Sequence, residues 1–175
     1  MQLAAAGHRV TAVDASGSRL ARLRENLERT HLAARLVEAD ALEWNPERQF
    51  DAILLDAPCS ATGTFRRHPE VLYRARPKVI AESADLQGKL LDRAAKWLRP
   101  GGILVYSVCS LEPEEGEDIV RAFLARHSDF RMEAPAALPV ASQLSTEGWV
   151  RILPGLLEAE GGLDGFFMAR LVRTA

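Results

Sequence analysis

Short apolar runs alternate with helix-like segments along this chain, and this alternation constrains the fold more than any other feature. Strand-like runs cover residues 8–16, 34–42, 50–58, 103–110, 149–154 and 165–173. Amphipathic or acid-led helical patterns cover residues 16–32, 76–102 and 113–130. Strand–helix alternation predicts an α/β fold with a mostly parallel, right-handed sheet. The last two runs are separated by a Gly-rich turn, which predicts an antiparallel C-terminal edge.

Length and composition fit one soluble domain, predicted here to span residues 1–175. Hydrophobic residues make up 47% and charged residues 26% of the chain, which is typical of globular proteins. No apolar run reaches the ~18–20 residues that a membrane helix needs, and the start lacks the pattern of a signal peptide. The two cysteines are too sparse for a disulfide scaffold or a metal site. These features predict a cytoplasmic protein with reduced thiols, no metal and no membrane contact.

Acidic side chains follow three of the predicted strands. Asp14, Asp40 and Asp56 each stand at or near a strand end, where α/β proteins bind their ligands. A single acid in such a position more often caps a loop or helix. Three in succession favour a nucleoside cofactor, with Asp14 accepting from a ribose diol and Asp40 from an adenine amino group or a neighbouring amide.

Both cysteines also lie at strand ends. Cys59 follows Asp-Ala-Pro at the exit of one run, and Cys109 ends the run "LVYSVC". Either cysteine alone is typical of a small buried hydrophobic residue. On one rim of a parallel sheet, however, the two can meet in space. A thiolate there would be a strong nucleophile if its surroundings lowered its pKa.

A cluster of positive charge follows the first cysteine. The net charge of −2 does not by itself indicate a nucleic-acid-binding protein. Residues 66–78 nevertheless set several cations against the single acid Glu70: Arg66, Arg67, Arg74, Arg76 and Lys78. Such a cluster can neutralise phosphates, although a charge run is more commonly a solvated surface. Its position directly after the Cys59 loop favours contact with RNA.

Two motifs identify a family resemblance. "DAPCSATGTFRRHPEV" (56–71) and "LVYSVCSLEPEEGE" (104–117) resemble motifs IV and VI of the Nop/Sun family of RNA (cytosine-5) methyltransferases, and the similarity runs through "DGFFMARL" (164–171). The resemblance implies a Rossmann-like class I fold that uses S-adenosylmethionine. The chain has no counterpart of the family's "AAPGGKT"-like loop, so the first strand of the sheet is expected to be missing.

The resemblance implies a role for each residue of the rim. Cys109 would be the nucleophile that adds to carbon 6 of the target cytosine. Asp56 would bind the cytosine or the cofactor and help to protonate ring nitrogen 3. Cys59 would assist the elimination that releases the methylated RNA. Asp14 and Asp40 would bind the cofactor's ribose and adenine.

We therefore expect an S-adenosylmethionine-dependent RNA cytosine-5 methyltransferase that acts on rRNA, with Arg66 and Arg67 contacting the RNA. Two alternatives stay open at this point. A methyltransferase with another substrate can share the fold, but it does not account for two cysteines beside an arginine-rich loop. A non-catalytic RNA-binding remnant is the other alternative, because the first cofactor motif is absent. The oligomeric state is left open.

Overall fold

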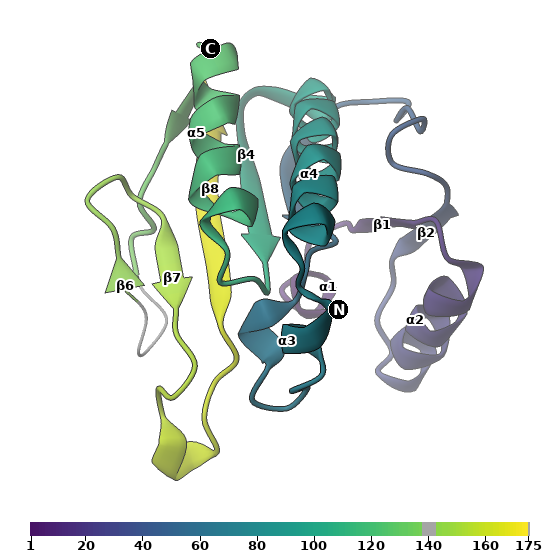
Figure 1. Cartoon of the computed structure of the whole chain (residues 1–175). Helices are drawn as coiled ribbons and strands as arrows, with labels where there is room; N and C mark the ends of the chain where they lie inside the picture. Colours follow the sequence, from purple (N-terminus) through teal and green to yellow (C-terminus); the bar gives the residue numbers. More distant parts are fainter. Residues whose placement is uncertain (138–142, 175) are drawn as a thin grey trace. The chain divides into compact units, whose positions relative to one another are not determined.

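The computed structural model describes residues 1–137 and 143–174 (Figure 1). The chain forms two compact units, Met1–Glu47 and Arg48–Ala175, and each is described by itself. The prediction of one domain over residues 1–175 therefore stays a prediction. No helix of the described part is long and apolar enough to cross a membrane.

The first unit is a small parallel β-α-β arrangement. Its elements are α1 (Gln2–Ala5), β1 (Thr11–Asp14), α2 (Gly17–Arg29) and β2 (Arg35–Glu38). The two strands are parallel, with Asp14 opposite Glu38. The helix begins at Gly17 because the Ser16 hydroxyl accepts a hydrogen bond from the Arg19 amide, as is usual for an N-cap serine. Leu20 and Leu27 form the buried face of the helix.

The second unit contains a mixed six-stranded sheet. Its strands are β3 (Phe50–Asp56), β4 (Leu98–Val108), β5 (Phe130–Met132), β6 (Gln143–Leu144), β7 (Val150–Ile152) and β8 (Phe166–Arg173). The hydrogen-bonded order is β3-β4-β8-β7-β6, and β5 also pairs with β8. The β3–β4 pair is parallel, whereas every pairing of β8 is antiparallel. The α/β fold and its antiparallel C-terminal part are thus confirmed, and the antiparallel part is larger than a single edge strand.

Helices α4 (Pro77–Trp97) and α5 (Glu117–Arg126) lie side by side against this sheet (Figure 1). Shorter helical segments complete the unit: α3 (Val71–Arg74) and the 3-10 turns η1 (Thr62–Thr64), η2 (Pro113–Glu115) and η3 (Glu158–Glu160). The core is formed by apolar side chains of α4, α5, β4 and β8, among them Leu91, Leu104, Phe123, Phe167 and Leu171.

The bounds of two predicted helices were wrong. The helix predicted over 76–102 ends at Trp97, because Leu98 is fully buried and pairs with Phe50 as the first residue of β4. The helix predicted over 113–130 begins as the separate turn η2, and α5 ends at Arg126. In both cases tertiary burial overrode the local helix signal.

Candidate active site

Two loops leave the same edge of the sheet and bring the two cysteines together. Asp56 is the last residue of β3 and lies opposite Ser107 of the parallel strand β4. The chain therefore leaves both strands in the same direction, and the Sγ atoms of Cys59 and Cys109 are 3.5 Å apart. Both thiols are free and half-buried. The prediction that the thiols meet in space is confirmed.

The close contact divides the charge unequally between the thiols. The hydrogen bond from Cys59 lowers the pKa of Cys109 to about 7, against burial and the negative charges of Asp56 and Asp164. The same contact, together with burial, raises the pKa of Cys59. Cys109 is therefore the thiolate near neutral pH, and Cys59 keeps its proton. Because the thiolate is the reactive form of cysteine, Cys109 is the more reactive thiol of the pair, and its role as the nucleophile stays a prediction.

Asp56 presents an open carboxyl group beside the thiols. The residue is exposed by surface area, yet the protein atoms around the carboxyl group raise its pKa through desolvation. Within residues 1–137 and 143–174, no hydrogen bond or ion pair to this carboxyl group is found. A partly desolvated acid with no protein partner is available to bind a ligand.

Backbone hydrogen bonds of Gly63 join the Cys59 loop to the Cys109 loop and to the chain that enters β8. The Gly63 amide donates to the carbonyl of Cys109 at 3.0 Å, and the Gly63 carbonyl accepts from the amide of Gly165 at 2.8 Å. A Cβ atom on Gly63 would lie 2.2 Å from the carbonyl oxygen of Gly165. Glycine is thus required where the η1 turn meets the chain that enters β8.

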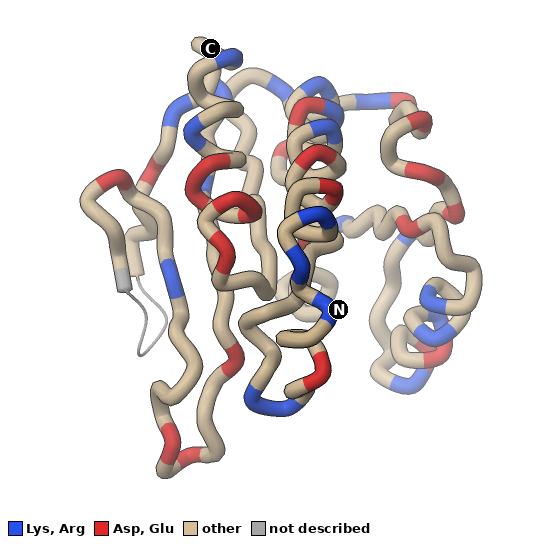
Figure 2. Tube along the Cα trace, viewed as in Figure 1, with Lys and Arg blue, Asp and Glu red and all other residues tan. Residues whose placement is uncertain are grey.

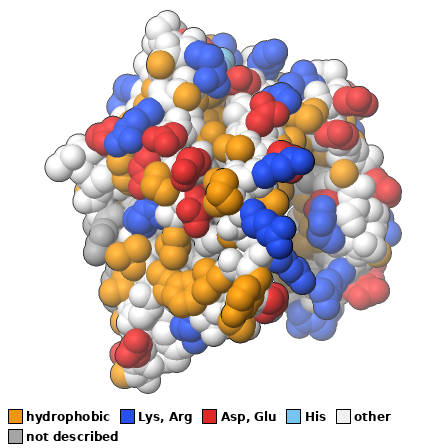
Figure 3. All heavy atoms as spheres, viewed as in Figure 1, with side chains coloured by type: hydrophobic (Ala, Val, Ile, Leu, Met, Phe, Trp, Pro, Cys, Tyr) orange, Lys and Arg blue, Asp and Glu red, His pale blue; other side chains and the backbone are white. Residues whose placement is uncertain are grey.

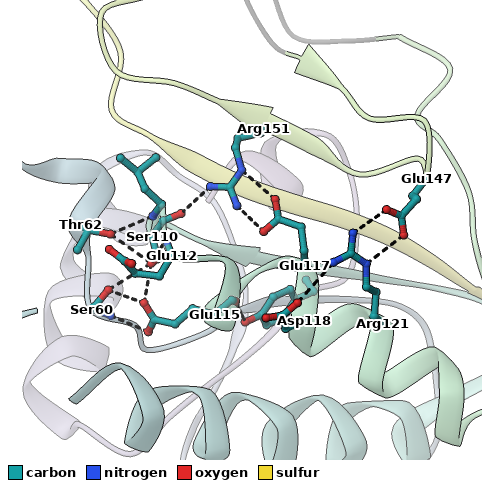
Figure 4. Close-up of polar contacts among 12 residues, drawn as sticks. Ser60, Thr62, Ser110, Glu112, Glu115, Glu117, Asp118, Arg121, Glu147 and Arg151 are labelled. Atoms are coloured by element: carbon teal, nitrogen blue, oxygen red, sulfur yellow. Dashed lines mark hydrogen bonds and ion pairs between the residues drawn. The ribbon is translucent and has the colours of Figure 1, made fainter. Parts of the chain in front are cut away.

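One buried acid next to the two cysteine loops, Glu115, was not predicted from the sequence. Glu115 was interpreted as one of the first-turn acids of a helix, but its side chain is fully buried in η2. Its carboxylate accepts from Ser60 and from Ser110, the residues that follow the two cysteines (Figure 4). The repeated Cys-Ser pair was the sequence signal that could have indicated a shared partner.

Arg66 and Arg67 lie in the loop after η1, and both point to an acid that the sequence analysis did not single out. Arg67 forms a bidentate ion pair with Asp164, and the guanidinium of Arg66 lies 3.9 Å from the same carboxylate. The pair with Arg67 lowers the pKa of Asp164. Arg67, which is predicted to contact RNA, therefore also links this loop to the segment before β8 through its ion pair with Asp164.

Beyond these two arginines, exposed side chains surround α3 and the start of α4. Figure 2 shows basic residues along this stretch, and Figure 3 shows hydrophobic and basic side chains next to one another on the same face. Tyr73 is 82% exposed and Leu72 is 56% exposed. In the described part of the chain, Arg74 and Arg76 form no ion pair within 4.0 Å. This surface offers an aromatic ring together with two arginines that have no ion-pair partner in the described residues.

Asp14 and Asp40 lie at the carboxyl edge of the β1–β2 sheet in the first unit. Asp14 ends β1 and accepts from the guanidinium of Arg19 at 2.7 and 2.8 Å and from the Ser16 amide at 2.8 Å. The Arg19 pair lowers the pKa of Asp14. Asp40 is exposed, and its Oδ1 accepts from the Leu42 amide at 2.8 Å. Their roles as cofactor ligands stay predictions.

The described residues contain no group of three or more His, Cys, Asp or Glu side chains that could hold a metal ion. What the second unit does contain is an α/β sheet whose adjacent parallel strands deliver an acid and two thiols to one edge. Known proteins with the same fold include Rossmann-like methyltransferases. By its fold and its site, this chain therefore belongs to the class of proteins with the Rossmann-like methyltransferase fold.

Comparison of sequences identifies the family within this class. The sequence model of the family described as "16S rRNA methyltransferase RsmB/F" matches residues 1–172. The chain belongs to this family, and the predicted resemblance is confirmed.

Individual relatives agree with this assignment. The chain is 42% identical over 171 residues to "Ribosomal RNA small subunit methyltransferase B" of Shewanella oneidensis, covering 95% of this chain and 38% of the relative. It is 45% identical over 172 residues to the protein of the same name from Pseudomonas syringae, covering 95% and 37%. This chain thus spans well under half the length of these relatives.

Solved structures give the same result. The structure of "NSun6 from Pyrococcus horikoshii with SFG" matches with a TM-score of 0.82 and 31% identity, covering 95% of this chain and 42% of that one. A "Methyltransferase Homolog Protein" from Pyrococcus horikoshii matches with a TM-score of 0.76 and 32% identity, covering 94% and 53%.

Proposed function

We propose that this chain is the catalytic part of an S-adenosylmethionine-dependent RNA (cytosine-5) methyltransferase that modifies small-subunit rRNA. The observation that carries the proposal is the Cys59–Cys109 pair, 3.5 Å apart, with the pKa of Cys109 lowered to about 7. Family membership supports the reaction class. The names of the relatives support the choice of rRNA.

Cytosine carbon 5 is a weak nucleophile, so the reaction needs prior activation of the ring. The Cys109 thiolate adds to carbon 6, forming a C–S bond and moving an electron pair toward ring nitrogen 3. Asp56 assists this step, because desolvation raises the pKa of its carboxylate, which therefore takes up a proton more readily and can pass it to nitrogen 3. Covalent addition of this kind divides one difficult step into two easier ones.

The methyl group comes from S-adenosylmethionine, which supplies it as an electrophile on a sulfonium centre. With the cofactor bound, carbon 5 would take the methyl group, S-adenosylhomocysteine would leave, and nitrogen 3 would return its proton to Asp56. Carbon 5 must then lose its own proton. Once Cys109 is a neutral thioether, the contact that raised the pKa of Cys59 no longer stabilises the Cys59 proton. Cys59 then becomes the base that removes the carbon 5 proton, and elimination breaks the C6–S bond and restores the Cys109 thiolate.

Asp14 and Asp40 are the proposed ligands for the ribose and the adenine of the cofactor. The carboxylate of Asp14 fits this role, because its strongest partner is the exposed side chain of Arg19. An exposed ion pair is worth little in free energy, so a ribose diol can replace it. The structural relative crystallised with SFG supports a small-molecule site in this fold.

RNA contact is proposed for Arg66 and Arg67 and for the exposed surface around α3. Arg74 and Arg76 add charge that no acid in the described residues neutralises by an ion pair, and cations of this kind bind phosphates without reading sequence. Tyr73 offers a ring on which an unpaired base can stack. Because rRNA is made and assembled in the cytoplasm of bacteria, we also propose a cytoplasmic location.

The test uses this chain, small-subunit rRNA and radiolabelled S-adenosylmethionine. Three variants are compared with the unmodified protein: Cys109→Ala, Cys59→Ala and the exposed control Ser128→Ala. Nucleoside mass spectrometry identifies the product, and denaturing gels reveal covalent protein–RNA adducts. The proposal predicts 5-methylcytosine with the unmodified protein and with the control.

Cys109→Ala is expected to abolish both methylation and adduct. Cys59→Ala is expected to accumulate a covalent adduct, because elimination is blocked. Addition still proceeds, but more slowly, since loss of the hydrogen bond from Cys59 raises the pKa of Cys109. Full activity of Cys109→Ala would overturn the proposed nucleophile. RNA binding by the unmodified protein with no methylation and no cofactor binding would instead favour the non-catalytic remnant.

A further inference from the structure

Glu115 is a buried acid that the proposed reaction does not use. Its side chain is fully buried, and no lysine or arginine of the described residues forms an ion pair with it. Burying a carboxylate is costly unless hydrogen bonds replace its water shell. Glu115 is therefore a buried carboxylate whose burial costs free energy, and the side chains around Glu115 indicate its role.

Four hydrogen bonds converge on the carboxylate. The amide and the hydroxyl of Ser60 both donate to it, the amide at 2.9 Å, and the hydroxyl of Ser110 donates at 2.6 Å (Figure 4). Gln87 of α4 donates from Nε2 at 3.0 Å. These four donors match the number of acceptor positions on a carboxylate.

The donors come from the two loops that carry the thiols. Ser60 follows Cys59 and Ser110 follows Cys109, and the two hydroxyl oxygens are themselves 3.2 Å apart. One carboxylate thus joins the residue after each thiol. The backbone of Glu115 is anchored in turn, because the buried Tyr106 hydroxyl donates to its carbonyl oxygen at 2.6 Å.

Gln87 connects helix α4 to the hydrogen bonds around the Glu115 carboxylate. Its Nε2 donates both to Glu115 and to the carbonyl of Pro58 at 2.8 Å, directly before Cys59. Its Oε1 is buried without a hydrogen-bond partner in the described residues. An unpaired buried oxygen costs free energy, so the amide is oriented to serve the carboxylate and the Pro58 carbonyl.

We propose that Glu115 is a positioning residue that sets the distance and orientation of Cys59 and Cys109 by holding Ser60 and Ser110 on one acceptor-only group. The proposal rests on the proposed function, since it assigns Glu115 to the same thiol pair. A neutral amide does not reproduce this arrangement, because its single oxygen would accept from the Ser60 amide and Gln87 while its NH₂ group would force the hydroxyls of Ser60 and Ser110 to accept instead of donate.

A purely electrostatic role for Glu115 makes the opposite prediction for the thiols. Its negative charge contributes to the raised pKa of Cys59, so removal of the charge alone would favour thiolates. Loss of positioning instead weakens the hydrogen bond from Cys59 that lowers the pKa of Cys109. The other charged groups that act on Cys109 are Asp56 and Asp164, and neither changes in the variants below.

The test compares Glu115→Gln and Ser110→Ala with the control Glu114→Gln, which replaces the exposed acid next to Glu115 in the same turn. Alkylation of Cys109 by iodoacetamide is followed by mass spectrometry as a function of pH, without RNA or cofactor. Thermal unfolding checks the fold, and kcat and KM for rRNA methylation are measured with the same proteins.

Glu115→Gln is expected to raise the midpoint of Cys109 alkylation by about one pH unit, toward an ordinary thiol. We expect kcat to fall at least about tenfold, because small displacements of reacting groups are costly, with little change in KM. Ser110→Ala keeps the charge of Glu115 but removes the hydrogen bond from the Ser110 hydroxyl to Glu115. It should therefore shift the midpoint of Cys109 alkylation in the same direction. Glu114→Gln should behave as the unmodified protein.

A folded Glu115→Gln with an unchanged or lowered midpoint and unchanged kcat would overturn the proposal. If Glu115→Gln fails to fold, Ser110→Ala decides, and an unchanged midpoint and kcat in that variant would overturn it equally. The alkylation measurement needs no RNA. A shifted midpoint in a protein that methylates no RNA would therefore disprove the proposed function while leaving the positioning role of Glu115 supported.

Discussion

At the scale of single residues, the molecule makes two chemically identical side chains different. Cys59 and Cys109 share one hydrogen bond, and their pKa values move in opposite directions because only one of the two can carry the negative charge. Neither a helix N-terminus nor a basic side chain is the main cause. The activating group is the second thiol.

This division predicts selective labelling of Cys109. Its rate of alkylation by iodoacetamide should rise with pH, with a midpoint at about 7, because the thiolate fraction increases as the pH passes its pKa. Cys59 should stay unlabelled over the same range, since its pKa is raised. Peptide mass spectrometry distinguishes the two sites.

The variant Cys59→Ala provides the control, because it removes the donor. The midpoint for Cys109 should then move upward, toward that of an ordinary thiol. Preferential labelling of Cys59 in the unmodified chain would contradict the assignment of the nucleophile.

At the scale of elements, the site depends on how short turns meet the sheet. The η1 turn contacts the segment before β8 through the backbones of Gly63 and Gly165, and the loop after η1 is fastened there by Arg67 and Asp164. The C-terminal strand therefore supports the Cys59 loop, although a hundred residues separate them in sequence.

Gly63→Ala tests this contact. The new Cβ would overlap the carbonyl of Gly165, so we expect a loss of about 1–3 kcal/mol in the free energy of unfolding, as for overpacked sites. Gly88→Ala is the matched control, because Gly88 lies inside α4 with no atom within 4 Å of an added Cβ. That substitution should stabilise by about 0.5–1 kcal/mol. Urea unfolding measures both, and equal stabilities would refute the expectation.

Helix α3 gives a prediction about RNA. Tyr73→Ala should weaken binding of a single-stranded RNA by about tenfold, since a stacked base contributes about 1–3 kcal/mol. Tyr73→Phe keeps the ring and should bind as the unmodified chain does. Fluorescence anisotropy with a labelled oligonucleotide measures the affinities. If Tyr73→Ala binds with unchanged affinity, the exposed ring is no stacking surface.

At the scale of the whole molecule, burial is distributed unequally between the two compact units. The first unit contributes only Leu20 and Leu27 to the buried apolar residues, whereas the second contains the extended core around Leu91, Leu104 and Phe167. Segments with few buried apolar contacts open at low cost in free energy.

Hydrogen exchange should reveal this difference directly. Amides of α2 are expected to exchange well before those of α4 and β4, because the α2 face buries so little apolar surface. Measurements at increasing urea concentration separate local opening from global unfolding. Equal protection of α2 and α4 would show that the chain unfolds as one cooperative unit.

Much of this arrangement could be predicted from local sequence. The runs 50–58 and 103–110 became β3 and the end of β4, and the pattern 16–32 became α2, because apolar periodicity reports which face is buried. The positions of Asp56, Cys59 and Cys109 at the ends of predicted strands were enough to predict that all three lie at one edge of the sheet. Contacts that depend on distant partners could not be found in this way.

Glu115 and Asp164 illustrate the limit. An acid before a helix usually complements the helix dipole, and only the arrival of Ser60 and Gln87 from elsewhere in the chain makes burial of Glu115 possible. Asp164 likewise gains its partner from Arg67, far away in sequence. The repeated Cys-Ser pair indicates at most that a shared partner exists, and local patterns do not identify which distant residue it is.

The short distance between the two sulfurs also has a practical consequence for work with this chain. Thiols 3.5 Å apart need little movement to form a disulfide, and the thiolate of Cys109 is the species that peroxides attack first. Oxidation would remove the nucleophile while leaving the rest of the fold intact. Assays therefore require a reductant, and a preparation that loses activity in air should regain it with dithiothreitol.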